Sequence, residues 1–120
     1  MPDSRPLATD LLSIVQECLE TEIAPQVSPL HRFQLKIVSR VLATVRREIE
    51  LAPDANADEL VRLKALLRRD GSREELDAAL AKSIRAGDFA VDDPALLAHL
   101  RASIEDALRI NNPKWLARAE

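Results

Sequence analysis

The chain has 120 residues, of which 47% are hydrophobic, 31% charged and 2% aromatic, and its net charge is −3. This length fits a single domain, expected over residues 1–120, that buries its core without disulfides or metal. The acidic balance argues against nucleic acid as a partner, because binding to phosphates needs a basic surface. The apolar runs are too short to cross a membrane, so no membrane association is expected either.

The first predicted helix follows a short N-terminal segment. Residues 1–6 lack a basic region followed by an apolar run, so we expect a flexible N-terminus rather than a signal peptide, and a cytoplasmic protein. Apolar side chains recur at helical spacing from about Leu7 to Glu22, which predicts a helix there. Cys18 is the only cysteine, and because it lies on this apolar stripe it is predicted to be buried.

The second predicted helix has the strongest signal and is expected to be the central rod of the fold. Ser28 can cap it, and Pro29 suits its first turn. Pro53 is expected to end it, since proline lacks the backbone N–H and clashes with the preceding turn. Val41, in the middle of the apolar stripe, is predicted to lie in the core. The stripe is formed by Leu30, Phe33, Ile37, Val38, Val41, Leu42, Val45, Ile49 and Leu51.

Three further helices are expected after Pro53. They run from Asn56 to Asp70-Gly71, from Ser72 to Gly87, and from Asp93 to about Asn111, with each glycine stopping a helix. Phe89 and Val91, in the loop before the last helix, are expected to pack inward. Because no segment alternates with the period of a strand, the predicted fold is all-α, a compact antiparallel bundle of about five helices around the long second helix. Residues 111–120 are expected to form a C-terminal tail.

No residue pattern predicts catalysis, a cofactor site or a metal site. His31 has no carboxylate or nucleophile nearby in the sequence and is expected to lie at the surface or beside the cap of the second helix. His99 lacks a second ligand three or four residues later, where Ala102 and Ser103 stand, so zinc is not expected. We therefore expect no enzymatic activity, no cofactor and no metal.

Two features are candidates for a partner surface. Arg32, Lys36 and Arg40 are spaced four residues apart on one side of the second helix, beside its apolar stripe. Such a strip fits phosphate or an acidic partner helix, or else long basic side chains at the rim of a core. Trp115, the only tryptophan, stands in the expected tail. It either contacts a partner, as tryptophan often does at interfaces, or folds back onto one end of the bundle.

Several stretches resemble a family of small bacterial proteins of unassigned activity. They are Arg32–Val38, Glu48–Leu51, Leu80–Gly87, Asp93–Leu97 and Asn112–Lys114. The resemblance covers nearly the whole chain. Members of this family are typically encoded beside aminoglycoside-phosphotransferase-like kinases and acyl-CoA dehydrogenases. The resemblance implies an accessory protein of such a kinase, which in part of the family's setting phosphorylates hydroxyacyl-CoA substrates, and it transfers no catalytic residues.

The sequence thus predicts a non-catalytic accessory protein. Its expected partner is a phosphotransferase-like kinase of acyl-CoA metabolism, bound through a surface that includes Arg32, Lys36, Arg40 and Trp115. The alternative is a small helical bundle, ligand-binding or enzymatic, in which Lys36 and Arg40 receive an anionic group such as a phosphate of coenzyme A. Self-association is a further expectation, because the apolar stripes are wide for so few helices.

Overall fold

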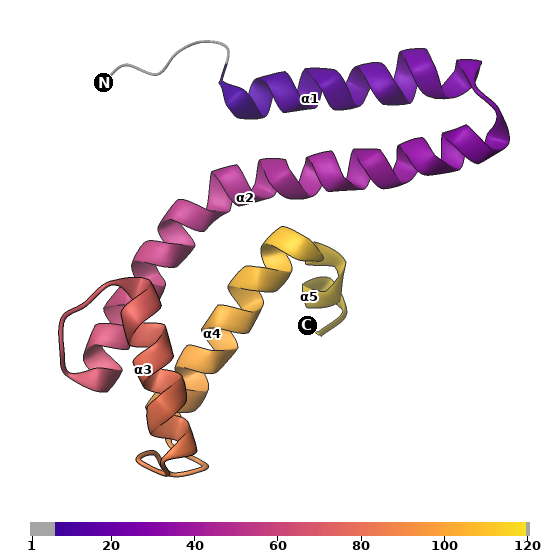
Figure 1. Cartoon of the computed structure of the whole chain (residues 1–120). Helices are drawn as coiled ribbons and strands as arrows, with labels where there is room; N and C mark the ends of the chain where they lie inside the picture. Colours follow the sequence, from indigo (N-terminus) through magenta and orange to yellow (C-terminus); the bar gives the residue numbers. More distant parts are fainter. Residues whose placement is uncertain (1–6, 120) are drawn as a thin grey trace. The chain divides into compact units, whose positions relative to one another are not determined.

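The computed structural model describes residues 7–119 and consists of helices joined by short turns (Figure 1). The α-helices in this part of the chain are α1 (Ala8–Cys18), α2 (Pro29–Leu67), α3 (Arg73–Arg85), α4 (Pro94–Asn111) and α5 (Pro113–Ala119). A π-helical turn, η1 (Leu19–Ile23), and a 3-10 turn, η2 (Ala24–Gln26), lie between α1 and α2. The predicted all-α fold with five helices is confirmed. The expected flexible segment, residues 1–6, lies outside the described residues.

The helices differ from the predicted ones most clearly at Pro53. The helix α2 continues through this proline to Leu67, so the predicted second and third helices are one helix of 39 residues. The predicted stop at Pro53 is therefore wrong. A proline inside a helix removes one hydrogen bond and costs about 3 kcal/mol, but alanines, the strongest helix formers, stand beside it at Ala52 and Ala55.

The C-terminal segment also differs from its prediction. Instead of a tail, residues from Pro113 to Ala119 form α5. Proline is favourable at the first position of a helix, because its missing N–H would have no partner there and its backbone angle is already helical.

None of the helices in the described part of the chain is long and apolar enough to span a membrane.

The chain divides into two compact units whose border lies inside α2. The first unit is Met1–Leu51 and the second is Ala52–Glu120. In the first unit, α1 runs antiparallel to the N-terminal part of α2, and the two form a helical hairpin (Figure 1). The expectation of one domain over residues 1–120 stays a prediction.

The two helices of the hairpin are joined by hydrogen bonds between side chains. The Arg46 guanidinium donates to the hydroxyl of Ser13 at 2.9 Å and to the side-chain oxygen of Gln16 at 3.5 Å. The Ser39 hydroxyl donates to the carboxylate of Glu20, and Ser39 is the one buried residue among residues 7–51. The side of α2 that faces α1 therefore carries these polar groups beside half-buried apolar residues such as Leu35.

The apolar stripe of α2 consequently does not form the core. All of its residues except Leu42 are exposed, and Val41 is 57% exposed. The prediction that Val41 lies in the core is wrong in this structure, because α1 packs against a different side of the helix. The prediction that Cys18 is buried is wrong for the same reason, since its side of α1 also faces away from α2.

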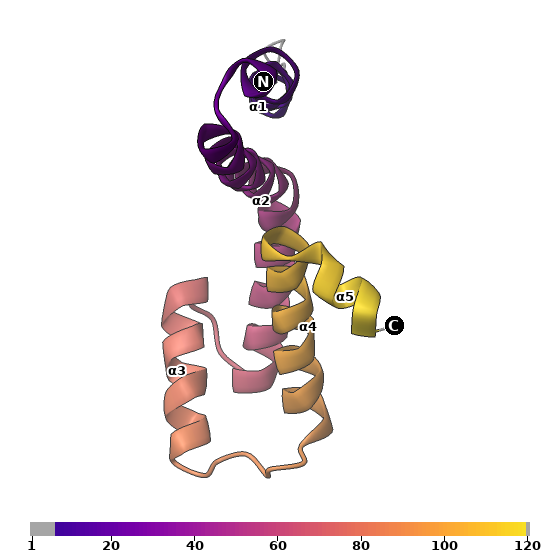
Figure 2. The same cartoon turned by 90° about the vertical axis from the view of Figure 1, so that its right-hand side faces the viewer.

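The buried core lies in the second unit, where α3 and α4 pack with the C-terminal part of α2 (Figure 2). Its centre is formed by leucines from these three helices: Leu63, Leu76, Leu80 and Leu96. Phe89 packs against this cluster as predicted, whereas Val91 is 95% exposed, so the inward position expected for Val91 is wrong.

The ends of the helices follow the sequence signals in part. Ser72 accepts the backbone N–H of Glu75 and caps α3, and Asp93 accepts that of Leu96 and caps α4. After α3, Gly87 adopts a φ of +80°, which glycine takes up without steric cost. The helix α2 ends instead with Arg68 at a φ of +54°.

Gly71 has a different role from the predicted one. A Cβ atom at this position would meet the Leu76 side chain at 3.1 Å, so Gly71 permits close packing onto the core.

Candidate functional site

The hairpin of the first unit contains a groove with a volume of about 720 Å³. The last turns of α1, with η1 and η2, form one wall, and α2 forms the other. The apolar part of the lining comes from Ala24, Pro25, Leu35 and Ala43. The polar part comes from Gln16, Glu20, Arg32, Lys36, Ser39 and Arg40.

The three basic residues of the predicted strip all line this groove. Because a helix has 3.6 residues per turn, their spacing of four places them one above another on α2. The structure thus brings Arg32, Lys36 and Arg40 together, as their spacing predicted. They lie beside the α1 contact rather than at the rim of a buried core.

Arg32 is occupied by the fold itself. Its Nε donates to the carbonyl oxygen of Ala24 at 3.1 Å, and its Nη2 donates to that of Val27 at 3.2 Å. The Ala24 carbonyl also accepts the backbone N–H of Val27 at 3.5 Å, so Arg32 adds side-chain hydrogen bonds to the turn that leads into α2. Arg32 therefore fixes the connection between the two helices.

Lys36 and Arg40 are available to a partner. Neither side chain forms a hydrogen bond or an ion pair with any of residues 7–119, and both are exposed. A lysine ammonium is a compact point charge, whereas an arginine guanidinium can hold a carboxylate or phosphate through two parallel hydrogen bonds. The pair can bind an anionic group at the groove.

The single carboxylate of the groove bonds to uncharged side chains. Glu20 accepts hydrogen bonds from the Ser39 hydroxyl and from the amide of Gln16, the latter at 3.3 Å. One carboxylate faces three cations in the lining, so the groove is positively charged overall. An anionic ligand is electrostatically favoured there.

Trp115 does not belong to this groove. It lies on α5 in the second unit and is 55% exposed, with the guanidinium of Arg118 at 5.6 Å from the centre of its ring. A cation over an aromatic face is attracted by the negative face of the ring. The four residues predicted as one partner surface therefore divide into three in the first unit and one in the second.

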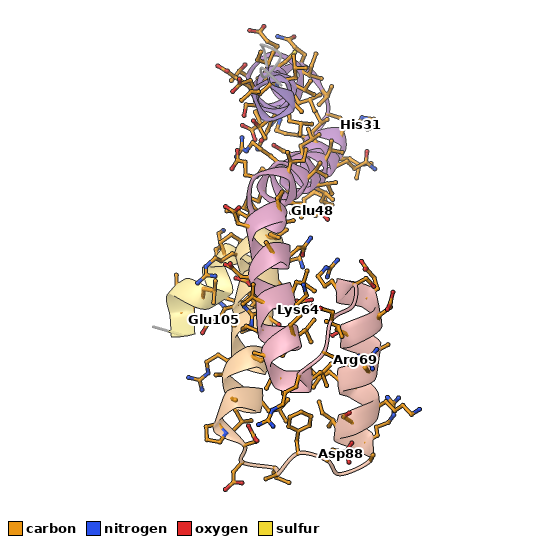
Figure 3. All side chains as sticks on the ribbon, turned by 90° about the vertical axis from the view of Figure 1, so that its left-hand side faces the viewer. His31, Glu48, Lys64, Arg69, Asp88 and Glu105 are labelled. Carbon is orange, nitrogen blue, oxygen red and sulfur yellow. The ribbon has the colours of Figure 1, made fainter. Side chains whose placement is uncertain are left out.

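The two histidines have separate local environments. His31 is exposed at the start of α2 and points away from the helix (Figure 3). Its backbone N–H donates to the Ser28 hydroxyl at 3.3 Å, and its Nδ1 lies 3.0 Å from the same oxygen. Ser28 thus caps α2 as predicted, and His31 lies beside the cap.

His99 is buried in the second unit, which the sequence analysis did not predict. The Nε of Arg62 donates to its Nδ1 at 3.0 Å, and the Nη2 of Arg62 donates to Ser103 at 3.2 Å. This bond assigns the proton of the neutral ring to Nε2. Burial lowers the pKa of His99 below 6.5, and the charge of Arg62 lowers it further, against the opposing effect of Glu59 and Asp77.

The free energy of unfolding is expected to fall as the pH drops below about 6.5, because unfolded His99 takes up a proton that the folded state resists. The loss should level off once the pH is below the lowered pKa of folded His99. Urea unfolding across this range checks it. His99→Gln keeps an oxygen that can accept from Arg62 and should lack this component. The same pH dependence in both proteins would contradict the prediction.

Within residues 7–119, no three histidine, cysteine or carboxylate side chains lie close enough to hold a metal ion.

The sequence analysis missed the polar contacts between α1 and α2, although they do have a signal in the sequence. Ser13, Gln16 and Glu20 recur at helical spacing on α1, and Ser39 and Arg46 are seven residues apart on α2. These are polar stripes that face each other in the hairpin.

The comparisons with known proteins identify a family without an assigned function. Residues 25–115 match the family model described as a domain of unknown function, DUF6285. The match spans most of the chain, so the chain belongs to this family. No curated protein and no solved structure gives a significant match.

Proposed function

We propose that this DUF6285 protein is a non-catalytic interaction protein whose groove binds an acidic segment of a partner protein. The observation that carries the proposal is that Lys36 and Arg40 stand unpaired at a groove with partly apolar walls. Carboxylates of a partner would meet both cations, while its apolar side chains would contact Ala43 and Leu35.

The resemblance noted in the sequence supplies the identity proposed for the partner, a phosphotransferase-like kinase of acyl-CoA metabolism. In this proposal the protein stabilises the kinase or completes its substrate site. The non-catalytic part of the proposal is supported by the histidines, since His31 lies beside a helix cap and His99 accepts a hydrogen bond within a packed unit.

Charge reversal at the groove is expected to weaken kinase binding by about tenfold or more. The Lys36→Glu/Arg40→Glu variant places carboxylates where an acidic segment would bind, and the loss should shrink as salt is added. Neither side chain contributes to the contact between α1 and α2, so folding should be little affected. Calorimetric titration against the purified kinase measures the change.

A matched control reverses two exposed cations of the second unit, in the Lys82→Glu/Arg101→Glu variant. It changes the net charge equally and should bind the kinase like the wild type. Equal affinity of the groove variant and the wild type for the kinase would refute the proposal. The mass of each variant in solution is measured in parallel, so that a change in self-association is recognised.

The groove also favours a second candidate function, the binding of an anionic small molecule such as coenzyme A. Its volume of about 720 Å³ is typical of pockets for small ligands, and cations stand beside apolar walls. Titration of coenzyme A into the same variants separates the two functions. Tight binding of coenzyme A that is lost in Lys36→Glu/Arg40→Glu would favour the ligand over the protein partner.

A further inference from the structure

The groove of the first unit lies along one flank of the hairpin. Ser39 faces α1, because its hydroxyl donates to the carboxylate of Glu20. At about 100° per residue, Lys36 and Arg40 lie roughly 60° and 100° around α2 from Ser39, both in the same direction. The lining residues of α2 extend over about three turns, or about 16 Å. The groove is therefore long enough for a segment of secondary structure.

The walls of the groove favour a helical segment over an extended one. Both walls are helical, so most of their backbone N–H and C=O groups bond within the wall itself. Polar side chains of the lining are engaged as well. Ser39 and Gln16 donate to Glu20, and Arg32 donates to the carbonyl of Ala24. The peptide groups of an extended segment would lose water there with few partners to replace it, whereas a helix bonds its own peptide groups.

We propose that the segment bound in the groove is an acidic helix, which packs against α1 and α2 as a third helix. The helix would belong to the partner of the proposed function, on which this inference rests. Lys36 and Arg40 are one turn apart, about 6 Å along α2. Two carboxylates four residues apart on a partner helix have the same spacing and share one face. Each carboxylate can therefore pair with one of the two cations.

The apolar lining specifies the rest of the partner helix. Leu35 and Ala43 on α2 and Ala24 on the opposite wall are half-buried at the groove. Apolar side chains on the stripe beside the two carboxylates would cover these residues while the charges meet at the edge of the groove. The small alanines on both walls leave room for larger side chains such as leucine. The expected partner segment is thus an amphipathic helix with an acidic edge.

Two synthetic peptides of identical composition test the proposal. Each is about 20 residues long and rich in alanine, so that it can form a helix in water. In the first peptide, two glutamates stand four positions apart, with leucines on the neighbouring stripe. In the second peptide, the later glutamate has changed places with the alanine two positions before it, so the glutamates stand two positions apart.

The first peptide should bind the wild-type chain about tenfold or more tightly than the second. In a helix, residues two positions apart point to nearly opposite sides, so the second peptide can offer only one carboxylate to Lys36 and Arg40. An extended segment would reverse this order, because residues two positions apart then share a side. Fluorescence anisotropy of the labelled peptides measures both dissociation constants.

The conformation of the bound peptide is measured separately. Infrared spectroscopy of an isotope-labelled first peptide distinguishes its backbone from that of the protein, and the bound peptide should be mainly helical. A proline placed between its two glutamates should weaken binding by about tenfold or more, because proline breaks a helix. Neither change alters the charge of the peptide.

Exchanging the charges identifies the residues that meet. A third peptide, with lysines in place of both glutamates, should bind Lys36→Glu/Arg40→Glu but not the wild type. Its binding also shows that this variant is folded. The first peptide should lose about tenfold or more in affinity for Lys36→Glu/Arg40→Glu. It should bind the control Lys82→Glu/Arg101→Glu, whose two positions are exposed in the second unit, like the wild type.

Equal or tighter binding of the second peptide, a bound first peptide that is not helical, or binding of neither acidic peptide would each overturn the proposal. Binding of coenzyme A alone would overturn it in favour of a small anionic ligand. Titration against the purified kinase separates this failure from that of the proposed function. If Lys36→Glu/Arg40→Glu still loses affinity for the kinase, only the helical form of the segment is wrong. If the affinity is unchanged, the proposed function itself fails.

Discussion

Leu63→Ala is expected to lower the free energy of unfolding by about 2–5 kcal/mol. Leu63 is 0% exposed and lies in the cluster that joins α2, α3 and α4. Its replacement removes several buried methyl and methylene groups and leaves a cavity among leucines that cannot collapse completely. A loss of this size is a large part of the 5–15 kcal/mol by which domains are normally stable.

Val61→Ala is the matched control, since Val61 lies on the same helix two residues away and is 68% exposed. It should change the free energy of unfolding by no more than about 0.5 kcal/mol, because little apolar surface is lost and alanine favours the helix. Urea unfolding followed by circular dichroism measures both. Equal effects of the two substitutions would show that Leu63 is not central to the core.

The sequence predicted the helices well because apolar spacing and capping residues are local signals. Ser72 and Asp93, at which two of the helices were predicted to begin, cap α3 and α4. The location of the core could not be read in the same way. The stripe around Val41 is longer and more apolar than the one around Leu63, yet only the latter is covered within the described chain. Periodicity shows that a face needs covering, but not by what.

For the candidate site too, the sequence predicted local features but not the contacts between segments. The spacing of Arg32, Lys36 and Arg40 predicted correctly that they share one side of a helix. It did not predict that Arg32 bonds the carbonyls of Ala24 and Val27. The contact of Arg62 with His99 joins residues 37 apart. Such contacts depend on how helices pack, which no local pattern specifies.

The exposed apolar stripe of α2 gives the missed core a physical explanation. In the second unit, α3 and α4 return to cover α2, so Leu63 becomes buried within one chain. In the first unit, α1 meets α2 through Ser39 and Arg46 and leaves Val41 outside. The apolar pattern of the first unit therefore marks a face that no part of the described chain covers.

Pro53→Ala is expected to raise the free energy of unfolding by about 2 kcal/mol. Pro53 lies inside α2, where it cannot donate to the carbonyl of Ile49 and its ring crowds that turn. Alanine is about 3 kcal/mol more favourable inside a helix. Part of this gain is offset because alanine leaves the unfolded chain about 0.4–1 kcal/mol more conformational freedom. The net effect should still be a clear stabilisation.

Pro94→Ala is the control that makes this result specific. Pro94 occupies the first turn of α4, where proline is favourable, so its replacement should give no gain. Urea unfolding of the two variants compares an interior proline with a terminal one in the same chain. If Pro53 ended a helix, as its sequence context predicted, Pro53→Ala would behave like Pro94→Ala. A gain at Pro53 alone requires a helix that runs on both sides of the proline, because only there does alanine restore a hydrogen bond.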